Sequence, residues 1–333
     1  MLNRINIRGK ILNLPAFFPD ATSGFIKSMD SNDLNECNID GVVVNTYHLL
    51  KNNFIDKIEK KGIHNYMNFN KPIVSDSGGF QIMSLIHQSP ELGKIHKNKI
   101  IFLLDSKKIE LTPESCIQLQ LKIGSDIIMC LDDCTRAESS FKEQEKSVER
   151  TIRWAKKCKK EFEKLTKNMK NKPKIFAIVQ GGDYKKLRKK CAESLIKMGF
   201  DGYSFGGFPV KKGKLMKNML EYVSNLLPDD KPKYAMGIGK PQDIIDCVKL
   251  GYNIFDCVIP TRDARHKRLF IPGKEIKIKP KYFNEKFECD CRLCKNFTLT
   301  ELHNFFQTDR KKAEKLATIH NLKTYSNLMK GLQ

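Results

Sequence analysis

IFDCVIPTRDAR, residues 254–265, combines a strand-like apolar run with one acid and two arginines. Its β-branched and aromatic residues predict a buried strand, which carries Asp256. Pro260 interrupts the strand pattern, and Arg262 and Arg265 follow it. A carboxylate near a strand end beside two arginines is typical of chemistry next to a polyanion.

Seven similar runs precede this one, and helix-patterned polar segments lie between most of them. Together the runs cover residues 14–18, 41–44, 72–75, 126–131, 175–179, 202–205, 234–238 and 254–259. Strand alternating with helix eight times predicts an α/β fold, a parallel (β/α)8 or TIM barrel.

The ends of these runs share polar or small residues. They are Asp20, Asn45, Asp76, Asp132, Gln180, Gly206, Gly239 and Asp256. Active sites of such barrels form at the carboxyl ends of the strands, so these residues are expected on one rim. Asp, Asn and Gly also cap helices and make turns, and for Asp20 and Gly239 both explanations stay open.

Two segments depart from a minimal barrel. Residues 82–111 are too long for a turn, and the apolar runs at 100–104 and 109–111 predict an inserted hairpin beside the rim. From about residue 261 the alternation ends and a basic tail begins. We therefore expect a catalytic barrel over residues 1–265 and a C-terminal subdomain with closing helices over 266–333.

The composition indicates a basic protein of a reducing compartment. Sixty Lys and Arg against 38 Asp and Glu give a formal charge of +22. This charge favours RNA or DNA as a partner through counterion release, although a general enrichment in surface Lys also explains it. Eleven cysteines, most of them scattered, and the lack of a long apolar segment predict a cytoplasmic protein without membrane association.

The tail holds a candidate metal site. Cys289, Cys291 and Cys294 form a Cys-x-Cys-x-x-Cys cluster, and His320 follows in a helical context, with His303 as a competitor. Three thiolates and one imidazole complete a tetrahedral zinc shell that leaves no position for water. The pattern predicts one structural Zn²⁺ per chain.

The rim residues suggest recognition of a base and attack at its sugar. The glycines after Asp76 allow a ligand close to the backbone, and Phe80 offers a stacking face. Asp132 and Gln180 have the acceptors and donors to pair with a purine edge, whereas Asp133 is better explained by capping or ion pairing. Two carboxylates flanking a glycosidic carbon permit a double displacement, with one acid as nucleophile.

At this point the sequence resembles the tRNA-guanine transglycosylases, the bacterial-type queuine tRNA-ribosyltransferases. The shared motifs extend over almost the whole chain: NTYHL at 45–49, SDSGGFQ at 75–81, GSD at 124–126, DDCT at 132–135, QG at 180–181, GY at 202–203, GG at 206–207, MGIGKP at 236–241, FDCVIPTR at 255–262, and the cysteine cluster with His320. The resemblance implies a (β/α)8 barrel and a zinc-bearing, tRNA-contacting subdomain. It also implies exchange of the wobble guanine of tRNA anticodons for a 7-deazaguanine.

The resemblance also implies a role for each matching residue. Asp256 matches the nucleophile that attacks the ribose, and Asp76 matches the general acid and base. The residues matching base contacts are Ser77, Phe80, Asp132, Gln180, Gly206, Gly207 and Met236. Arg262 and Arg265 match residues near the anticodon, and Cys289, Cys291, Cys294 and His320 match the zinc ligands.

Two departures from the family pattern bear on substrate and assembly. Lys212 stands where bacterial members carry Glu, which leaves open whether 7-aminomethyl-7-deazaguanine or queuine enters. A homodimer is implied, yet Glu301 and Asn304 follow Phe297 where further rings are expected. Two alternatives remain: a non-catalytic RNA-binding subunit of a heterodimer, and a related base-exchange enzyme acting on DNA. The choice of tRNA and the protonation roles of the two acids are beyond the sequence.

Overall fold

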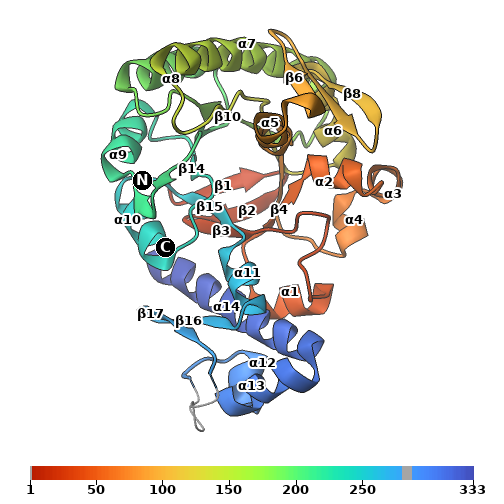
Figure 1. The fold of residues 1–333 in the computed structure, drawn as a ribbon, viewed down its shortest axis with the longest axis vertical. Coiled ribbons are helices and arrows are strands. Elements are labelled where there is room, and N and C mark those ends of the chain that lie inside the picture. Colours follow the sequence, from red (N-terminus) through yellow and green to blue (C-terminus); the bar gives the residue numbers. More distant parts are fainter. Residues whose placement is uncertain (1, 280–286) are drawn as a thin grey trace.

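The predicted strands form a closed parallel barrel (Figure 1). The computed structural model describes residues 2–279 and 287–333, and over these residues eight parallel strands pair in the order β3, β15, β14, β11, β10, β9, β5 and β4. A bridge between Asp20 and Val43 joins the two ends of this order. The strands are β3 (Ala16–Pro19), β4 (Val42–Asn45), β5 (Ile73–Asp76), β9 (Ile127–Met129), β10 (Lys174–Val179), β11 (Gly202–Phe205), β14 (Lys233–Ala235) and β15 (Ile254–Cys257). The TIM-barrel prediction is confirmed.

Helices follow the strands and surround the barrel (Figure 1). They are α1 (Ser31–Cys37), α2 (Thr46–Lys51), α3 (Ile55–Lys61), α4 (Ile63–Met67), α5 (Gly79–Gln88), α6 (Pro113–Ile123), α7 (Phe141–Thr166), α8 (Lys185–Met198), α9 (Lys217–Leu226), α10 (Pro241–Lys249) and α11 (Ile259–Arg265). In α7, a capping box between Ser140 and Glu143 satisfies the first backbone amides. Val148, Trp154 and Phe162 bury one face of this helix against the barrel.

The amino-terminal end of the barrel is filled by a hairpin of β1 (Arg4–Ile7) and β2 (Lys10–Asn13). Ile7 and Leu12 join the same buried apolar cluster as Phe18 of β3. Asp126, which precedes β9, is 1% exposed and pairs with His64 at 2.9 Å. Because this end is packed with side chains, a ligand site at the opposite rim is favoured.

The predicted inserted hairpin is present but larger than expected. Strands β7 (Ile100–Leu104) and β8 (Lys107–Leu111) pair across a tight turn, in which Asp105 and Ser106 both have positive φ. A further strand, β6 (Gly93–Ile95), pairs with β7 after a 3₁₀ turn at Pro90–Leu92. The sequence prediction missed β6 because three residues with one apolar side chain carry almost no alternation.

The C-terminal residues form a lobe beneath the barrel in Figure 1. It contains β16 (Arg268–Ile271), β17 (Lys274–Lys277), α12 (Arg292–Asn296), α13 (Leu299–Thr308) and α14 (Arg310–Leu332). Helix α14 also contacts the barrel, where the Tyr325 hydroxyl donates to the Gly239 carbonyl and the Asn321 amide donates to Pro260. The division at residue 265 stays a prediction, and residues 280–286 of the predicted subdomain lie outside the described residues.

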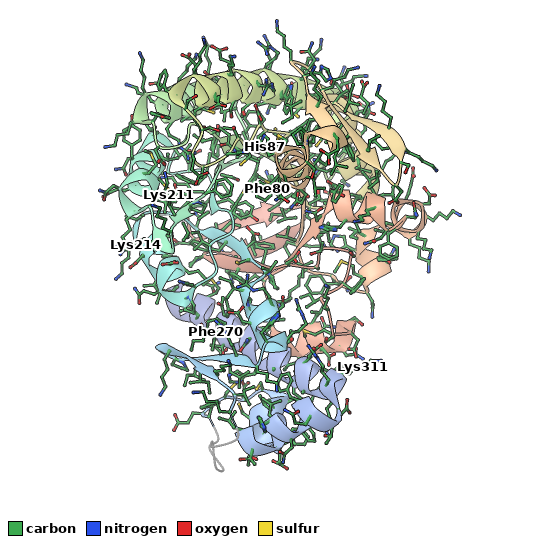
Figure 2. The ribbon with its side chains drawn as sticks, viewed as in Figure 1. Phe80, His87, Lys211, Lys214, Phe270 and Lys311 are labelled. Atoms are coloured by element: carbon green, nitrogen blue, oxygen red, sulfur yellow. The ribbon has the colours of Figure 1, made fainter. Side chains whose placement is uncertain are left out.

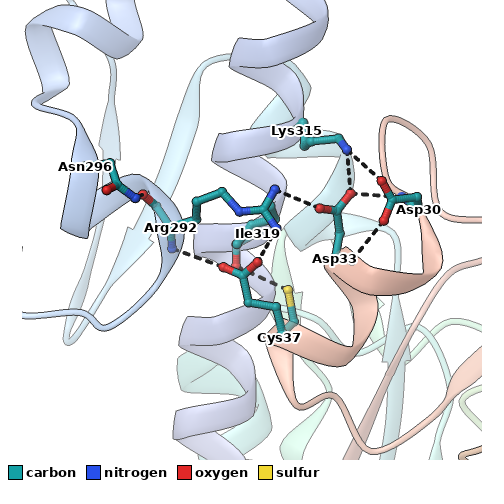
Figure 3. A network of polar contacts seen from close by, with 8 residues as sticks. Asp30, Asp33, Cys37, Arg292, Asn296, Lys315 and Ile319 are labelled. Carbon is teal, nitrogen blue, oxygen red and sulfur yellow. Dashed lines mark hydrogen bonds and ion pairs between the residues drawn. The ribbon is translucent and has the colours of Figure 1, made fainter.

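A polar network joins α1 to the lobe (Figure 3). Asp33, only 1% exposed, pairs with Arg292 at 3.0 Å and with Lys315 at 2.8 Å. Glu36 also pairs with Arg292, and Asp30 with Lys315. A carboxylate this deeply buried needs such partners, so the network fixes the lobe to the barrel through charge as well as apolar packing.

Within the part of the chain that the structure describes, no helix has both the length and the apolar character needed to cross a bilayer.

Candidate active site and metal centre

A cavity of about 370 Å³ lies at the carboxyl ends of the barrel strands. It brings together all the residues predicted for catalysis or base binding: Asp76, Ser77, Phe80, Asp132, Gln180, Gly206, Gly207, Met236 and Asp256. These residues are far apart in sequence, and the parallel strand order alone places them on one rim.

Asp76 ends β5 and is held by donors from two loops. The Asn45 amide donates to Oδ2 at 2.6 Å, and the backbone amides of Thr46 and Gly78 donate to Oδ1 at 3.1 and 3.0 Å. Burial raises the pKa of Asp76 to about 7, although the two backbone amides oppose the shift. Gly78 has a φ of 70°, and a Cβ there would meet the Thr46 hydroxyl at 2.5 Å, which explains the glycine.

Asp256 lies on β15 and has a different set of donors. Among the described residues, its hydrogen bonds both reach Oδ1, from the Tyr234 hydroxyl at 2.8 Å and the Gly237 amide at 3.0 Å. Burial raises the pKa of Asp256 to about 6, and these two donors limit the rise. Both acids therefore have pKa values raised towards neutral pH.

Asp132 and Gln180 form a polar pair on the cavity wall. The Gln180 amide donates to Asp132 Oδ2 at 2.7 Å, and both side chains are buried. Burial raises the pKa of Asp132 to about 7, and the Gln180 bond opposes this. Asp133 instead forms an ion pair with Arg150. The sequence predicted an ion-pairing or capping role for Asp133, and its partner is an arginine.

Arg188 supports this wall and was missed by sequence reasoning. It is 1% exposed, and its guanidinium donates to the carbonyls of Val179, Gly182 and Gly206. The same group lies 4.2 Å from the Phe205 ring centroid. The available signal was a basic residue within the apolar face of α8.

Apolar side chains form the remaining walls of the cavity. Phe80 projects from α5 (Figure 2), and its ring lies 6.0 Å from that of Phe208. Both residues are exposed, at 44% and 40%, although they line the cavity. Met236 and Tyr234 also line the cavity, and neither Phe208 nor Tyr234 was predicted for the site.

Lys212, the departure noted in the sequence, lies on an exposed turn outside the described cavity lining. This turn joins β12 (Val210–Lys211) to β13 (Lys214–Leu215), and Lys212 adopts a φ of 48°. Val210 lines the cavity, and Lys211 pairs with Asp183 at 2.5 Å. Of the residues in the β12–β13 hairpin, Val210 is therefore the one that lines the described cavity.

The two predicted arginines both lie on α11, just after β15. Arg262 is half exposed and its Nε donates to Asp263 at 3.0 Å. Arg265 donates to the Thr261 carbonyl at 2.9 Å. Both lie outside the described cavity lining, on the element that follows Asp256.

The predicted metal ligands meet in the lobe. One ligand atom from each of Cys289, Cys291, Cys294 and His320 lies within 4.8 Å of the others. His320 directs Nδ1 toward the thiols, and its Nε2 lies 2.9 Å from the Phe270 carbonyl. An N–H at Nε2 would donate to that carbonyl and leave Nδ1 to bind a metal. His303 lies outside this group among the described residues, so His320 is the histidine of the cluster.

Fold and site together define the class, a (β/α)8-barrel enzyme with paired acids in a rim cavity. The family model for queuine tRNA-ribosyltransferase matches residues 2–333. A queuine tRNA-ribosyltransferase of Psychrobacter sp. (strain PRwf-1) is 39% identical over 97% of this chain and 86% of its own. The queuine tRNA-ribosyltransferase of Acinetobacter baumannii (strain AYE) is 37% identical over 99% of this chain and 88% of its own. That of Tolumonas auensis is 37% identical over 97% of this chain and 87% of its own. The chain belongs to this family of pentosyltransferases.

Proposed function

We propose that this protein is a tRNA-guanine transglycosylase, which exchanges the wobble guanine of tRNA anticodons for a 7-deazaguanine base. The observation that carries the proposal is the pair of partly buried acids, Asp76 and Asp256, facing one cavity beside the Asp132–Gln180 pair. The family match supports tRNA as the substrate. A subunit that only binds RNA has no use for two such acids.

The first half of the reaction removes guanine. Asp256 attacks the ribose C1′ through Oδ2, the oxygen turned away from Tyr234 and Gly237, while the glycosidic bond breaks. Asp76 supplies a proton to the departing guanine, consistent with its pKa, which burial raises to about 7. The product is a ribosyl ester on Asp256, with neutral guanine free to leave.

The second half reverses these steps with the new base. Asp76, now ionised, accepts the proton from the ring nitrogen of the incoming 7-deazaguanine as that nitrogen attacks C1′. The ester bond breaks and Asp256 is released as a carboxylate. No nucleotide hydrolysis is needed, because one glycosidic bond replaces another.

Base selection follows from the cavity wall. Asp132 accepts from the ring N–H and exocyclic amino group of the base, and the Gln180 amide donates to its carbonyl oxygen. Ser77 and the backbone at Gly206 and Gly207 add polar contacts at the same edge. Phe80 and Met236 cover the two faces of the ring.

The Cys3His group fits Zn²⁺, because three thiolates and an imidazole suit its tetrahedral preference. When bound, zinc would supply a structural cross-link and no open position for chemistry. Cys289 and Cys291, which precede α12, and Cys294, which lies within it, would be tied to His320 of α14. We propose that this lobe, with Arg262 and Arg265, contacts the tRNA backbone, and that the protein acts as a homodimer.

The test is exchange of labelled guanine into a wobble-G tRNA. We expect incorporation by the native protein, loss of at least about 10³-fold in Asp256→Ala, and a covalent protein–tRNA adduct that the variant does not form. Lack of incorporation by the native protein would refute the proposal. Duplex DNA, tested at the same salt concentration, distinguishes a DNA-directed enzyme.

The incoming base is assigned by competition between 7-aminomethyl-7-deazaguanine and queuine in the same assay. Val210 and Phe208 line the cavity beside the loop that carries Lys212. Val210→Gly enlarges this part of the cavity, so we expect it to favour the bulkier queuine relative to the native enzyme. Lys212→Ala, on the exposed turn, is the matched control and should leave the preference unchanged.

A further inference from the structure

Asp20 is a partly buried carboxyl residue of the rim that the proposed mechanism does not use. It follows β3 directly and bridges to Val43, which lines the cavity. Asp256 lies opposite Phe18 in the register between β15 and β3. Side chains two residues apart share a face of a strand, so Asp20 points to the same interior side as Phe18 and Asp256.

The barrel order places Asp20 between the two acids. Strand β3 pairs with β15, which carries Asp256, and its bridge leads to β4, whose Asn45 lies opposite Asp76 of β5. The Asn45 backbone amide also donates to the Thr22 carbonyl at 3.1 Å, so the segment carrying Asp20 is fixed against β4. Asp20 is thus held next to both halves of the acid pair.

The groups that face Asp20 come from its own loop and four other elements. The Thr22 hydroxyl donates to its Oδ2 at 2.5 Å. Arg265 on α11 brings a positive charge, and His48 on α2 brings an imidazole whose pKa is lowered by burial. The acids that face Asp20 are Asp76 on β5 and Asp256 on β15. Burial raises the pKa of Asp20, and Thr22, His48 and Arg265 oppose that rise.

We propose that Asp20 is a positioning residue for the exchange reaction, a third carboxyl group of the rim that acts on Asp256 and Asp76 from the strand between those that carry them. This inference rests on the proposed function. Burial is the larger cause of the raised pKa of Asp76 and of Asp256, and the charge of Asp20 adds to both. Asp20 touches neither reacting atom and acts through the other two acids.

The proposal predicts a particular change in the pH profile. Neutralising Asp20 removes a charge that raises both pKa values, so Asp256 ionises at lower pH and Asp76 loses its proton at lower pH. Activity requires ionised Asp256 and protonated Asp76, so both limbs of the profile should move to lower pH. The activity of the variant relative to the native enzyme should therefore rise as the pH falls below the acid limb.

The experiment measures kcat/KM for guanine exchange against pH in Asp20→Asn, Asp20→Ser and Asp20→Glu, with thermal unfolding as a check of folding. Asp20→Glu keeps the charge and should keep the native limbs. The matched control, Asp56→Asn on the exposed side of α3, makes the same charge change away from the cavity and should also keep them.

Neutral variants whose limbs coincide with those of the native enzyme, or move to higher pH, would overturn the inference. Failure of all three Asp20 variants to fold would assign a structural role to Asp20 and overturn it as well. An inactive native protein would instead refute the proposed function, so the two failures are distinguishable.

Discussion

Asp76 and Asp256 are both partly buried carboxyls, and their hydrogen-bond donors are arranged differently. Asp76 faces donors on both oxygens, whereas the Tyr234 hydroxyl and the Gly237 amide converge on one oxygen of Asp256. Donors to the ionised form lower a pKa, so Tyr234 helps Asp256 to remain a nucleophile near neutral pH.

Tyr234→Phe tests this assignment. Burial already raises the pKa of Asp256 to about 6, and loss of the Tyr234 hydrogen bond should raise it further. The acid limb of the kcat/KM profile should then move to higher pH, the opposite direction from Asp20→Asn, with little change at the basic limb.

The matched control is Tyr222→Phe on α9, which also removes one tyrosine hydroxyl but lies outside the described cavity lining. An acid limb that stays in place in Tyr234→Phe would show that the hydroxyl does not tune Asp256.

At the scale of elements, α1 and α14 are joined through Asp33 (Figure 3). Lys315 and Arg292 both pair with this buried carboxylate, and each is about one-third exposed. Asp33 is buried and cannot be hydrated if one of these cations is removed. Loss of a cation is therefore expected to destabilise the fold mainly by leaving the Asp33 charge without a partner.

Lys315→Met should lower the free energy of unfolding by about 1 to 3 kcal/mol, because Asp33 loses a hydrogen-bonded charge while remaining buried. Denaturant unfolding measures this effect. Lys311→Met, on the exposed side of the same helix (Figure 2), is the control and should change stability by less than about 0.5 kcal/mol. Equal effects in the two variants would contradict a stabilising role for the network.

At the scale of the whole molecule, α14 unites the barrel and the lobe. Its Tyr325 ring lies 4.8 Å from Phe17 in the barrel and 5.4 Å from Phe270 in the lobe, measured between centroids. His320, on the same helix, belongs to the metal cluster. Loss of a metal should therefore destabilise the packing of α14 against the barrel as well as the segment that carries the cysteines.

Metal removal tests this coupling. We expect one zinc per chain by elemental analysis, and a strong chelator should lower Tm and weaken tRNA binding together. Cys294→Ser should have the same effects without chelator, whereas Cys247→Ser, away from the cluster, should retain zinc. Full zinc content in Cys294→Ser would contradict the assigned ligand set.

The sequence predicted much of this structure because its signals are local. Strand runs, their polar ends and the cysteine spacing each lie within a few residues, and the barrel rule then places the strand ends on one rim. Residues that act through partners distant in sequence were missed. Arg188 and Tyr234 look like an ordinary helix cation and an ordinary strand aromatic until the fold supplies Gly206 and Asp256 as their partners.

By itself, the sequence determined the barrel, the polar strand ends of its rim and the three-cysteine cluster, because hydrophobic periodicity and close ligand spacing are properties of the chain alone. Only the tertiary structure decided that His320 rather than His303 joins the cysteines, and that Val210 rather than Lys212 meets the cavity. It also placed Asp20 between the two acids of the rim. The physical reason is that burial and the distances between charges are set by packing between elements, which no single stretch of sequence contains.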